Sequence, residues 1–365
     1  MRRGENIYKR KDGRWEGRYK KGKKANGKTK YGSVYGRTLS EVRSKLYPLK
    51  SKYQEIRGKY GESSMSLEWW GTSWLTEMKQ EVKESTYANY QYKLTHYVFP
   101  VIGTYALNEL TPEIGAILLT HLQKKQLSAS TIRVIFRILN QCLNQAKSKE
   151  YVTENSFTEI KLPKAGKEKA RALTREEQRR LEKTANTEKA NAGFPVLLAL
   201  HSGLRIGEIA ALQWEDIDFQ TNLIRVRHTL QRVKRDHQTE LILTSSKTDS
   251  SVRTIPLSDT MRILLWEHKK QAISKFVFST NGHAIEPRLL TYHFHKIRKK
   301  VGLEQIHFHQ LRHTFATRCI ETQGDIASVS AILGHRSTQM TLDTYTDALI
   351  EQRVRVVKQM EKAIA

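Results

Sequence analysis

The chain has few cysteines and no long hydrophobic run. Only two of its 365 residues are cysteines, Cys142 and Cys319, which excludes a disulfide framework and indicates a reducing compartment. The longest apolar run, residues 194–200, contains Pro195 and is too short to span a bilayer. The first six residues, Met-Arg-Arg-Gly-Glu-Asn, have no apolar segment behind their charges, so we expect no secretory signal. Secreted, membrane-spanning and zinc-finger proteins are therefore excluded, and a cytoplasmic location is expected.

Negative charge is also scarce. The chain has 63 Lys and Arg against 37 Asp and Glu, a formal net charge of +26, within a globular composition of 38% hydrophobic residues. Residues 1–60 carry +15 of this charge, residues 61–162 carry none and residues 163–365 carry +11. Charge that served only solubility would be spread evenly. This distribution predicts a polyanionic partner, of which nucleic acid is the most common.

Residues 1–60 have the pattern of a small folded domain. Two alternating segments, residues 7–11 and 14–20, flank the Asp-Gly pair at 12–13, which predicts a hairpin. In the second segment Arg14, Arg18 and Lys20 alternate with aromatic or small residues, so they share one face of the sheet.

A third strand and a helix complete this domain. Asn-Gly at 26–27 predicts a second turn, and the strand after it, residues 29–35, carries Lys30. Thr38 with Glu41 predicts a capping box for a helix that ends near residue 57. A three-stranded sheet with cations on its open face is suited to the DNA major groove.

Residues 58–64 have a linker composition, and residues 66–162 have a helical pattern throughout. Four helices are expected, and their predicted starts are Ser66, Ser85, Thr111-Pro112 and either Ser128 or Ser130. Four helices in this length make a compact α domain. Although its net charge is zero, Lys124 and Arg133 are candidates for a DNA-binding face.

The third domain is predicted to cover residues 172–365, after a polar, basic connector at 163–171. Thr174 with Glu177 predicts the start of its first helix. Strand patterns at 223–233, 240–246 and 252–257 interrupt an otherwise helical sequence. Apolar residues spaced along the tail, residues 346–365, predict an amphipathic helix that packs on its own domain or on a neighbouring subunit. The chain is therefore expected to be multidomain and mainly α, with small β elements.

Metal and nucleotide sites find little support. The His pairs 293/295 and 307/309 have no Cys or carboxylate at ligand spacing. Glu215, Asp216 and Asp218 could hold magnesium for a nuclease, but their position after Trp214 favours a turn. No glycine-rich loop precedes Lys-Ser or Lys-Thr. We expect no metal and no cofactor.

Six residues of the third domain carry chemistry in a fixed order. They are Arg205, Lys247, His309, Arg312, His335 and Tyr345, separated by 42, 62, 3, 23 and 10 positions. Arg205 and His335 follow helix-ending glycines, and His309 and Arg312 lie one helical turn apart as two cationic groups. Lys247 is predicted at the tip of a turn that follows a strand.

This ordered set resembles the signature of the tyrosine site-specific recombinases, which is Arg, Lys, His-x-x-Arg, His or Trp, and Tyr. No catalytic position departs from that pattern. The resemblance covers nearly the whole chain and is greatest to the arm-binding integrases of phages and conjugative transposons. It implies an arm-type DNA-binding domain at 1–60, a core-binding domain at 66–162 and a catalytic domain at 172–365.

The chemistry of the six residues agrees with this resemblance. Breaking a phosphodiester without metal needs cations on the non-bridging oxygens, a nucleophile and an acid for the leaving oxygen. Arg205 and Arg312 would clamp the phosphate, and Tyr345 would attack it and store the bond energy as a 3′-phosphotyrosine. Lys247 is the predicted acid, His309 would assist proton transfer, His335 would hydrogen-bond a non-bridging oxygen, and Glu208 would orient its neighbours.

The sequence therefore predicts a DNA strand-exchange enzyme of a mobile element that works through a Holliday junction. The resemblance implies a homotetramer on double-stranded core and arm sites, DNA-bending accessory proteins, and activity at the nucleoid of a prokaryotic host. Two alternatives stay open. A type IB topoisomerase uses a similar residue set, and a non-catalytic DNA-binding regulator would explain the charge alone.

Overall fold

The computed structural model describes most of the chain. The described residues are 5–23, 28–61, 65–164, 166, 171–235, 238–245, 252–322, 324–335 and 337–344, with residues 354, 357–358 and 360–361 of the tail. They divide into two compact units, Met1–Lys167 and Glu168–Ala365, and each unit is described by itself. The boundary falls in the predicted connector at 163–171. The finer division of the first unit into two domains stays a prediction.

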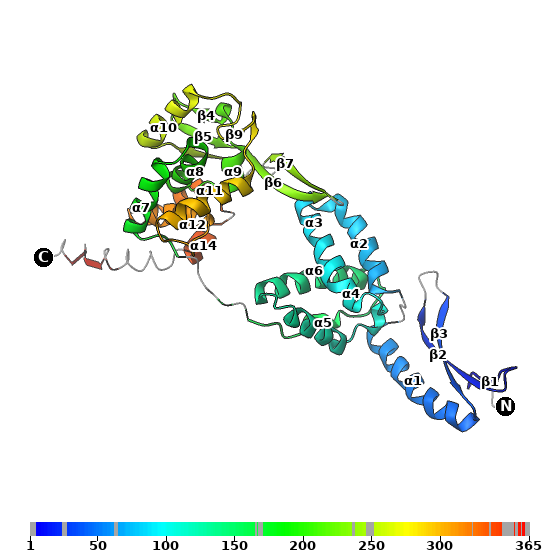
Figure 1. Ribbon diagram of the computed structural model, residues 1–365. Helices are drawn as coiled ribbons and strands as arrows, with labels where there is room; N and C mark the ends of the chain where they lie inside the picture. Colours follow the sequence, from blue (N-terminus) through cyan, green and yellow to red (C-terminus); the bar gives the residue numbers. More distant parts are fainter. Residues whose placement is uncertain are drawn as a thin grey trace. The chain divides into compact units, whose positions relative to one another are not determined.

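The first unit begins with a three-stranded antiparallel sheet backed by a helix (Figure 1). The strands are β1 (Ile7–Lys9), β2 (Trp15–Lys23) and β3 (Thr29–Gly36), in the order β1-β2-β3, followed by helix α1 (Leu39–Tyr60). The predicted hairpin is confirmed, with Ile7 opposite Gly17 and a positive φ at Gly13. The second predicted turn, at 26–27, lies outside the described residues.

Helix α1 differs from its prediction at both ends. Thr38 caps it as expected by accepting from the Glu41 N–H at 3.2 Å, but the Glu41 carboxylate accepts from the N–H of Arg37 and not from that of Thr38. The helix also continues to Tyr60, past the predicted end near residue 57. The expected linker at 58–64 is therefore helical over its first three residues. The helix ends only at Gly61, whose φ is 90°.

The rest of the first unit is helical. Its elements are α2 (Leu67–Glu81), α3 (Glu84–Lys93), the π-helical turn η1 (Leu94–Val98), α4 (Phe99–Ile102), η2 (Leu107–Glu109), α5 (Pro112–Lys124), α6 (Ala129–Ser148) and η3 (Ser156–Glu159). Ser66 and Ser128 cap α2 and α6 through their side chains. The predicted cap at Ser85 is wrong, because α3 already begins at Glu84 with Lys83 as its N-cap. The fully buried Trp70 and Trp74 belong to the core of these helices.

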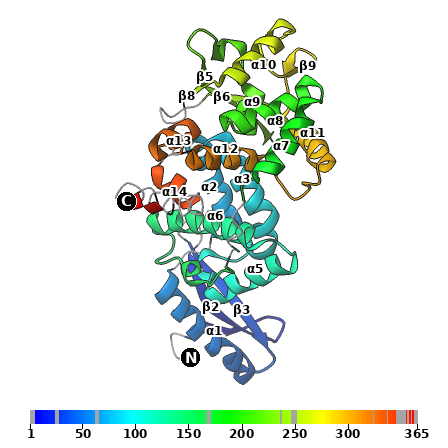
Figure 2. The ribbon, with the colours of Figure 1, turned by 90° about the vertical axis from the view of Figure 1, so that its left-hand side faces the viewer.

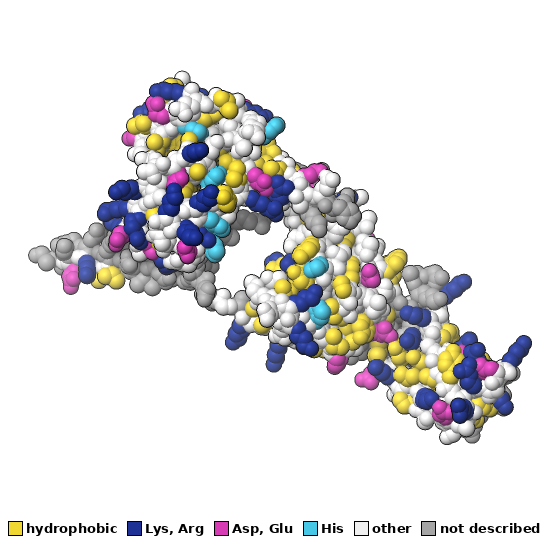
Figure 3. Space-filling model, viewed as in Figure 1, with side chains coloured by type: hydrophobic (Ala, Val, Ile, Leu, Met, Phe, Trp, Pro, Cys, Tyr) yellow, Lys and Arg dark blue, Asp and Glu magenta, His cyan; other side chains and the backbone are white. Residues whose placement is uncertain are grey.

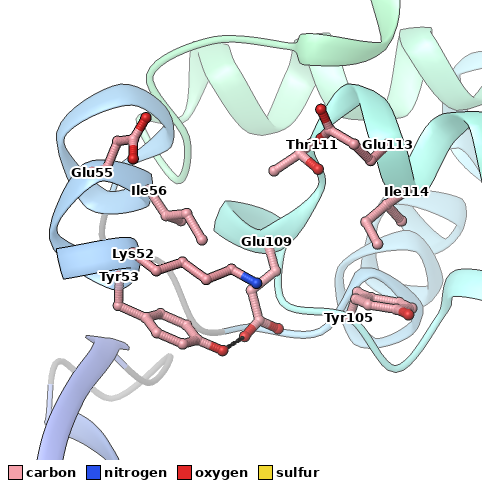
Figure 4. A pocket seen from close by; sticks show the side chains of 9 residues that line it. All are labelled: Lys52, Tyr53, Glu55, Ile56, Tyr105, Glu109, Thr111, Glu113 and Ile114. Atoms are coloured by element: carbon pink, nitrogen blue, oxygen red, sulfur yellow. Dashed lines mark hydrogen bonds between the residues drawn. The ribbon is translucent and has the colours of Figure 1, made fainter. Parts of the chain in front are cut away.

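Helix α1 also packs on these helices, within the same unit. The Tyr53 hydroxyl donates to the Glu109 carboxylate at 2.7 Å, and the Asn108 amide donates to the Lys21 carbonyl at 3.1 Å. Figure 4 shows Tyr53 and Glu109 at one side of a groove of about 580 Å³ between α1 and the segment that leads into α5. The basic sheet and the helices are thus joined by polar contacts on α1 and η2.

The second unit is built around helix α8 (Ala190–Ser202). The other helical elements are α7 (Arg175–Asn186), α9 (Ile206–Ala211), η4 (Trp214–Asp216), α10 (Asp259–Lys270), α11 (Pro287–Lys300), α12 (His309–Glu321), α13 (Ile326–Leu333) and α14 (Thr338–Thr344). Thr174 and Glu177 form the predicted capping box of α7. All residues of α8 from Gly193 to Leu200 are buried, which explains the longest apolar run in the sequence. Helices α12, α13 and α14 lie together in this unit (Figure 2).

The second unit also contains small sheets. They are formed by β4 (Ile217–Asp218), β5 (Leu223–Val226) and β8 (Arg253–Pro256), by the hairpin β6 (His228–Arg235) with β7 (Gln238–Ser245), and by β9 (Ser279–Thr280) with β10 (His283–Ala284). The strand pattern predicted at 223–233 forms two strands, β5 and β6, because the chain leaves one sheet at Arg227 and enters another. Figure 1 shows the β6–β7 hairpin projecting from the rest of its unit.

Candidate active site

Arg205 lies between two helices, where the sequence predicts it. Helix α8 ends at Gly203 in the left-handed conformation, and Arg205 is the N-cap of α9. The Arg205 side chain is 42% exposed. It is therefore accessible to a ligand from solvent.

Glu208, one turn into α9, fixes the Arg205 side chain. Its carboxylate accepts from the Arg205 backbone N–H at 2.9 Å and from the Arg205 Nη1 at 2.8 Å. The same two oxygens accept from Nη1 and Nη2 of Arg253 at 2.9 and 2.6 Å. Burial alone would raise the pKa of Glu208, but the hydrogen bonds and charge of Arg253, aided by Arg205, lower it to about 2. Glu208 is thus ionised at neutral pH and holds both arginines.

The end of helix α13 gathers three arginines. Three consecutive carbonyls, which we call the 332–334 turn, each accept from a different guanidinium: Ile332 from Arg253 at 2.7 Å, Leu333 from Arg312, and Gly334 from Arg205 at 3.4 Å. The last carbonyls of a helix have no partner within the helix and form the negative end of its dipole. Cations are therefore favoured here, and this turn brings Arg205 and Arg312 to one place.

Arg312 is more enclosed than Arg205. It comes from α12, is 2% exposed, and its Nη1 also donates to the Gly203 carbonyl at 2.8 Å. The two predicted phosphate clamps are therefore unequal. Arg205 faces solvent, whereas contact of Arg312 with a phosphate would require a local rearrangement.

The histidines of this region are neutral at physiological pH. Burial, together with the nearby Arg312 and Arg205, lowers the pKa of His309 and lowers that of His335 to about 4. Burial and His309 likewise lower the pKa of His313 to about 4. The sequence predicts His309 to be a cationic group beside Arg312; burial, followed by the charges of Arg312 and Arg205, instead lowers its pKa and favours its neutral form.

The His335 ring is held by a buried hydroxyl. His335 follows the 332–334 turn, its N–H donates to the Ser330 carbonyl at 3.1 Å, and its Nδ1 lies 2.8 Å from Oγ1 of the fully buried Thr341. If the threonine hydroxyl donates to Nδ1, the neutral ring carries its proton on Nε2. That tautomer offers an N–H donor, which is what a non-bridging phosphate oxygen requires.

The structure thus brings four of the six predicted residues together: Arg205, His309, Arg312 and His335. Lys247 and Tyr345 lie outside the described residues. Sequence reasoning missed Arg253 and Thr341. Arg253 alternates in phase with the buried Ile255 on β8, so the strand pattern contained a signal that its side chain points inward.

The predicted cations of the first unit fall on two faces. Arg18 and Lys20 lie on the face of β2 that points away from α1, as expected, and Arg14 directly precedes this strand. Lys30 pairs with Gly22 and shares the opposite face with Gly32 and Val34. Figure 3 shows Lys and Arg side chains spread over the surface of this sheet and α1. Lys124 ends α5 and is exposed.

Glu16 organises the open face of the sheet. It is 3% exposed and accepts from Arg18 Nε at 2.9 Å, from Arg10 Nη1 at 3.0 Å and from Ser33 Oγ at 2.8 Å. Hydrogen bonds from Arg18 and Tyr8 lower its pKa to about 2. Arg10 and Arg18 are therefore held in fixed positions around one buried carboxylate.

A second polar surface lies along helix α6. Arg133, Arg137, Asn140, Gln141 and Asn144 recur at helical spacing and, with Leu162, line a groove of about 530 Å³. Arg133 also donates to the Pro163 carbonyl at 2.8 Å. Arginine and amide side chains are those that pair with base edges in DNA grooves.

The described residues contain no group of three or more His, Cys, Asp or Glu side chains that could hold a metal ion. Asp216, the last residue of η4, is paired with Arg227. Asp218, which ends β4, accepts from the N–H groups of Gln220 and Thr221 in the turn that follows. Over the part of the chain that the structure describes, no helix is long and apolar enough to cross a membrane.

Two family profiles match the sequence. The profile described as "Phage integrase family" matches residues 171–352, and "Phage integrase, N-terminal SAM-like domain" matches residues 67–116. The chain is 28% identical over 258 residues to a tyrosine recombinase XerC-like protein of Caldanaerobacter subterraneus subsp. tengcongensis, covering 63% of this chain and 66% of that protein. It is 24% identical over 298 residues to the integrase of Mycobacterium phage L5, covering 79% of this chain and 77% of that protein. The chain thus spans about two thirds to three quarters of the length of these relatives.

Solved structures show the same fold. The Tn1549 transposon integrase in complex with a circular intermediate DNA matches with a TM-score of 0.70 at 20% identity, over 80% of this chain and 100% of that one. A lambda integrase dimer bound to a COC′ core site matches with a TM-score of 0.60 at 18% identity, over 94% of this chain and 95% of that one. The multidomain, mainly helical architecture predicted from the sequence is confirmed. Because the two profiles match in order and together span more than half of the sequence, this chain belongs to the phage integrase family, the tyrosine site-specific recombinases.

Proposed function

We propose that this chain is a site-specific DNA recombinase of a mobile element that cuts and rejoins strands through Tyr345. The observation that carries the proposal is the convergence of Arg205, Arg312 and His335 at the 332–334 turn. Such preorganised donors stabilise the charge that develops on a phosphate during attack, and they do so without metal.

The reaction balances with the residues of this chain. The Tyr345 oxygen attacks the phosphorus, its proton leaves with help from His309, and the bond from phosphorus to the 5′-oxygen breaks. Lys247 gives that oxygen a proton, which leaves a 3′-phosphotyrosine and a free 5′-hydroxyl. The 5′-hydroxyl of a second duplex then attacks the phosphotyrosine and releases Tyr345. Two such exchanges form and resolve a Holliday junction, so no ATP is consumed.

The DNA-binding surfaces are assigned by their charge and chemistry. The open face of the N-terminal sheet, with Arg14, Arg18 and Lys20, would bind arm sites, and Lys30 would contact DNA only from the edge of the other face. The α6 groove with Arg133, together with Lys124, would bind the core site. Two attachment points on one chain raise the effective concentration of the second site.

The assembly is proposed as a homotetramer on double-stranded DNA, because a lambda integrase tetramer bound to a Holliday junction shares this fold. In the tail, Val354 and Val357 are exposed, as expected of an apolar face that docks on a neighbouring subunit. The DNA substrate would place the activity in the cytoplasm of a prokaryotic host, at its nucleoid, where DNA-bending proteins would assist.

A nicked duplex that contains the core site tests the proposal. Wild-type protein should form a covalent adduct that survives denaturation, and Tyr345→Phe should bind the duplex without forming it. Tyr292→Phe, at an exposed tyrosine of α11, is the matched control and should form the adduct. An adduct in Tyr345→Phe refutes the nucleophile, and loss of cleavage on adding a chelator refutes the metal-free mechanism.

The same duplex separates the alternatives. Formation of joint molecules between two duplexes indicates a recombinase, whereas relaxation of supercoils without joint molecules indicates a topoisomerase. Binding without any adduct indicates a regulator. For Lys247→Ala, a substrate with sulfur at the 5′-bridging position should restore cleavage, because a thiolate leaves without a proton. Failure of this rescue would exclude the acid role.

A further inference from the structure

Arg253 opens strand β8 and is buried like a core residue. Its side chain is 6% exposed, and along β8 it occupies the same inward face as Ile255. A buried charge is costly unless it is paired and fully hydrogen-bonded. Its burial therefore needs an explanation in what it contacts.

All three guanidinium nitrogens of Arg253 donate to the site. Nη1 and Nη2 bind the Glu208 carboxylate at 2.9 and 2.6 Å, and Nε binds the Ile332 carbonyl at 2.7 Å. One planar group thus bridges helix α9 and the end of α13. The single nitrogen of a lysine cannot make this set of bonds.

Two routes lead from Arg253 to Arg205. Through Glu208, Arg253 holds the carboxylate that accepts from both the backbone N–H and Nη1 of Arg205. Through Ile332, it holds the turn whose next two carbonyls accept from Arg312 and Arg205. Displacing Arg253 would therefore change the position of Arg205 relative to Arg312, the two proposed phosphate-binding arginines.

We propose that Arg253 is a positioning residue for strand cleavage, which aligns Arg205 and the 332–334 turn without touching DNA. This inference rests on the proposed recombinase function. Its burial and its three bonds keep it from the phosphate, so it acts through Glu208 and Ile332. The competing explanation is structural, in which Arg253 only neutralises the buried charge of Glu208.

The variant Arg253→Lys separates the two explanations, because it keeps the charge and loses the fork. Single-turnover cleavage is measured on two nicked core-site duplexes, one with a natural scissile phosphodiester and one with a methylphosphonate there. The methylphosphonate lacks a charged non-bridging oxygen and depends less on aligned cations. We expect cleavage of the phosphodiester to fall about 10²-fold, the cost of a misplacement of about 1 Å. Cleavage of the methylphosphonate should fall much less.

The ratio of the two rates does not depend on the fraction of folded protein, so partial misfolding does not obscure the result. Glu208→Asp breaks the same link from the other side and should change the ratio in the same direction. Arg227→Lys is the matched control, since Arg227 pairs with the buried Asp216 away from the site and should leave the ratio unchanged. Equal losses on both substrates, or no loss, would overturn the inference. Adduct formation by Tyr345→Phe would instead overturn the recombinase function.

Discussion

Replacing Gly334 by alanine should disable the site more than it destabilises the fold. Gly334 ends helix α13 with a φ of 63°, and its N–H and that of His335 return to the carbonyls of Ala331 and Ser330. An added Cβ would lie 2.9 Å from Cδ of Arg253 and 3.3 Å from its Nε. The Arg253 side chain cannot swing away, because its guanidinium is bound to Glu208 and Ile332.

Two costs follow from this geometry. An alanine at a left-handed position costs about 1–2 kcal/mol in backbone strain. The overlap with Arg253 must be relieved by movement of a few tenths of an ångström or more, which displaces the 332–334 turn. Since Gly334 and Glu208 both bind Arg205, we expect single-turnover cleavage to fall between about tenfold and 10²-fold.

Gly302 supplies the control within the same unit. It follows helix α11 with a φ of 69° and the same return of hydrogen bonds, yet a Cβ there meets nothing within 4 Å. Thermal unfolding and adduct formation are measured for Gly302→Ala and Gly334→Ala. Both should lose a similar amount of stability to backbone strain, and only Gly334→Ala should lose cleavage. Equal cleavage by the two variants would refute the coupling of the turn to Arg205.

Two further predictions concern pH and arm binding. Because burial and the arginines lower the pKa of His335 to about 4, the unfolded state binds more protons between pH 6.5 and 4. The free energy of unfolding should therefore fall as the pH decreases from 6.5. Urea titrations at several pH values should show a shallower fall for His335→Gln than for the wild type. An identical dependence on pH in the two proteins would contradict the low pKa of His335. Glu16→Gln should weaken binding of an arm-site duplex, because Arg10 and Arg18 lose their common partner, although the net charge becomes more positive. Glu55→Gln makes the same charge change at an exposed position of α1 and should not weaken binding. If both variants bound the arm-site duplex as tightly as the wild type, or more tightly, the role of Glu16 would be contradicted.

Much of the fold follows from local sequence signals. The Asp-Gly turn, the caps at Thr38, Ser66 and Thr174, and the apolar stripes predict most helices and the N-terminal hairpin at their observed places. The errors occur where tertiary contacts decide. The strand pattern around Arg227 is continuous in sequence, yet its two halves pair with different strands, β8 and β7. No local signal specifies which partner a strand will find.

Of the six predicted site residues, the four that the structure describes lie together, but the contacts that join them were not predicted. Gly203 and Gly334 indicate that Arg205 and His335 follow helix ends, and the order of six residues indicates their family. That three arginines share one turn depends on α8, α12, α13 and β8 meeting in space. The low pKa of His335 has the same origin, since it results from burial and from the charges of Arg312 and Arg205, which come from other elements.

The charges of this turn explain why a phosphate would bind there. Arg205, Arg253 and Arg312 carry three positive charges. Glu208 carries one negative charge, and the carbonyl end of helix α13 supplies about half a negative charge more. The remaining positive charge is unfavourable in the free protein, and a phosphodiester would offset it. Because every DNA backbone offers the same phosphate, this attraction carries no sequence information. Selection of the correct site must therefore come from surfaces that reach base edges, and among the described residues we propose the sheet face around Glu16 and the α6 groove for this role.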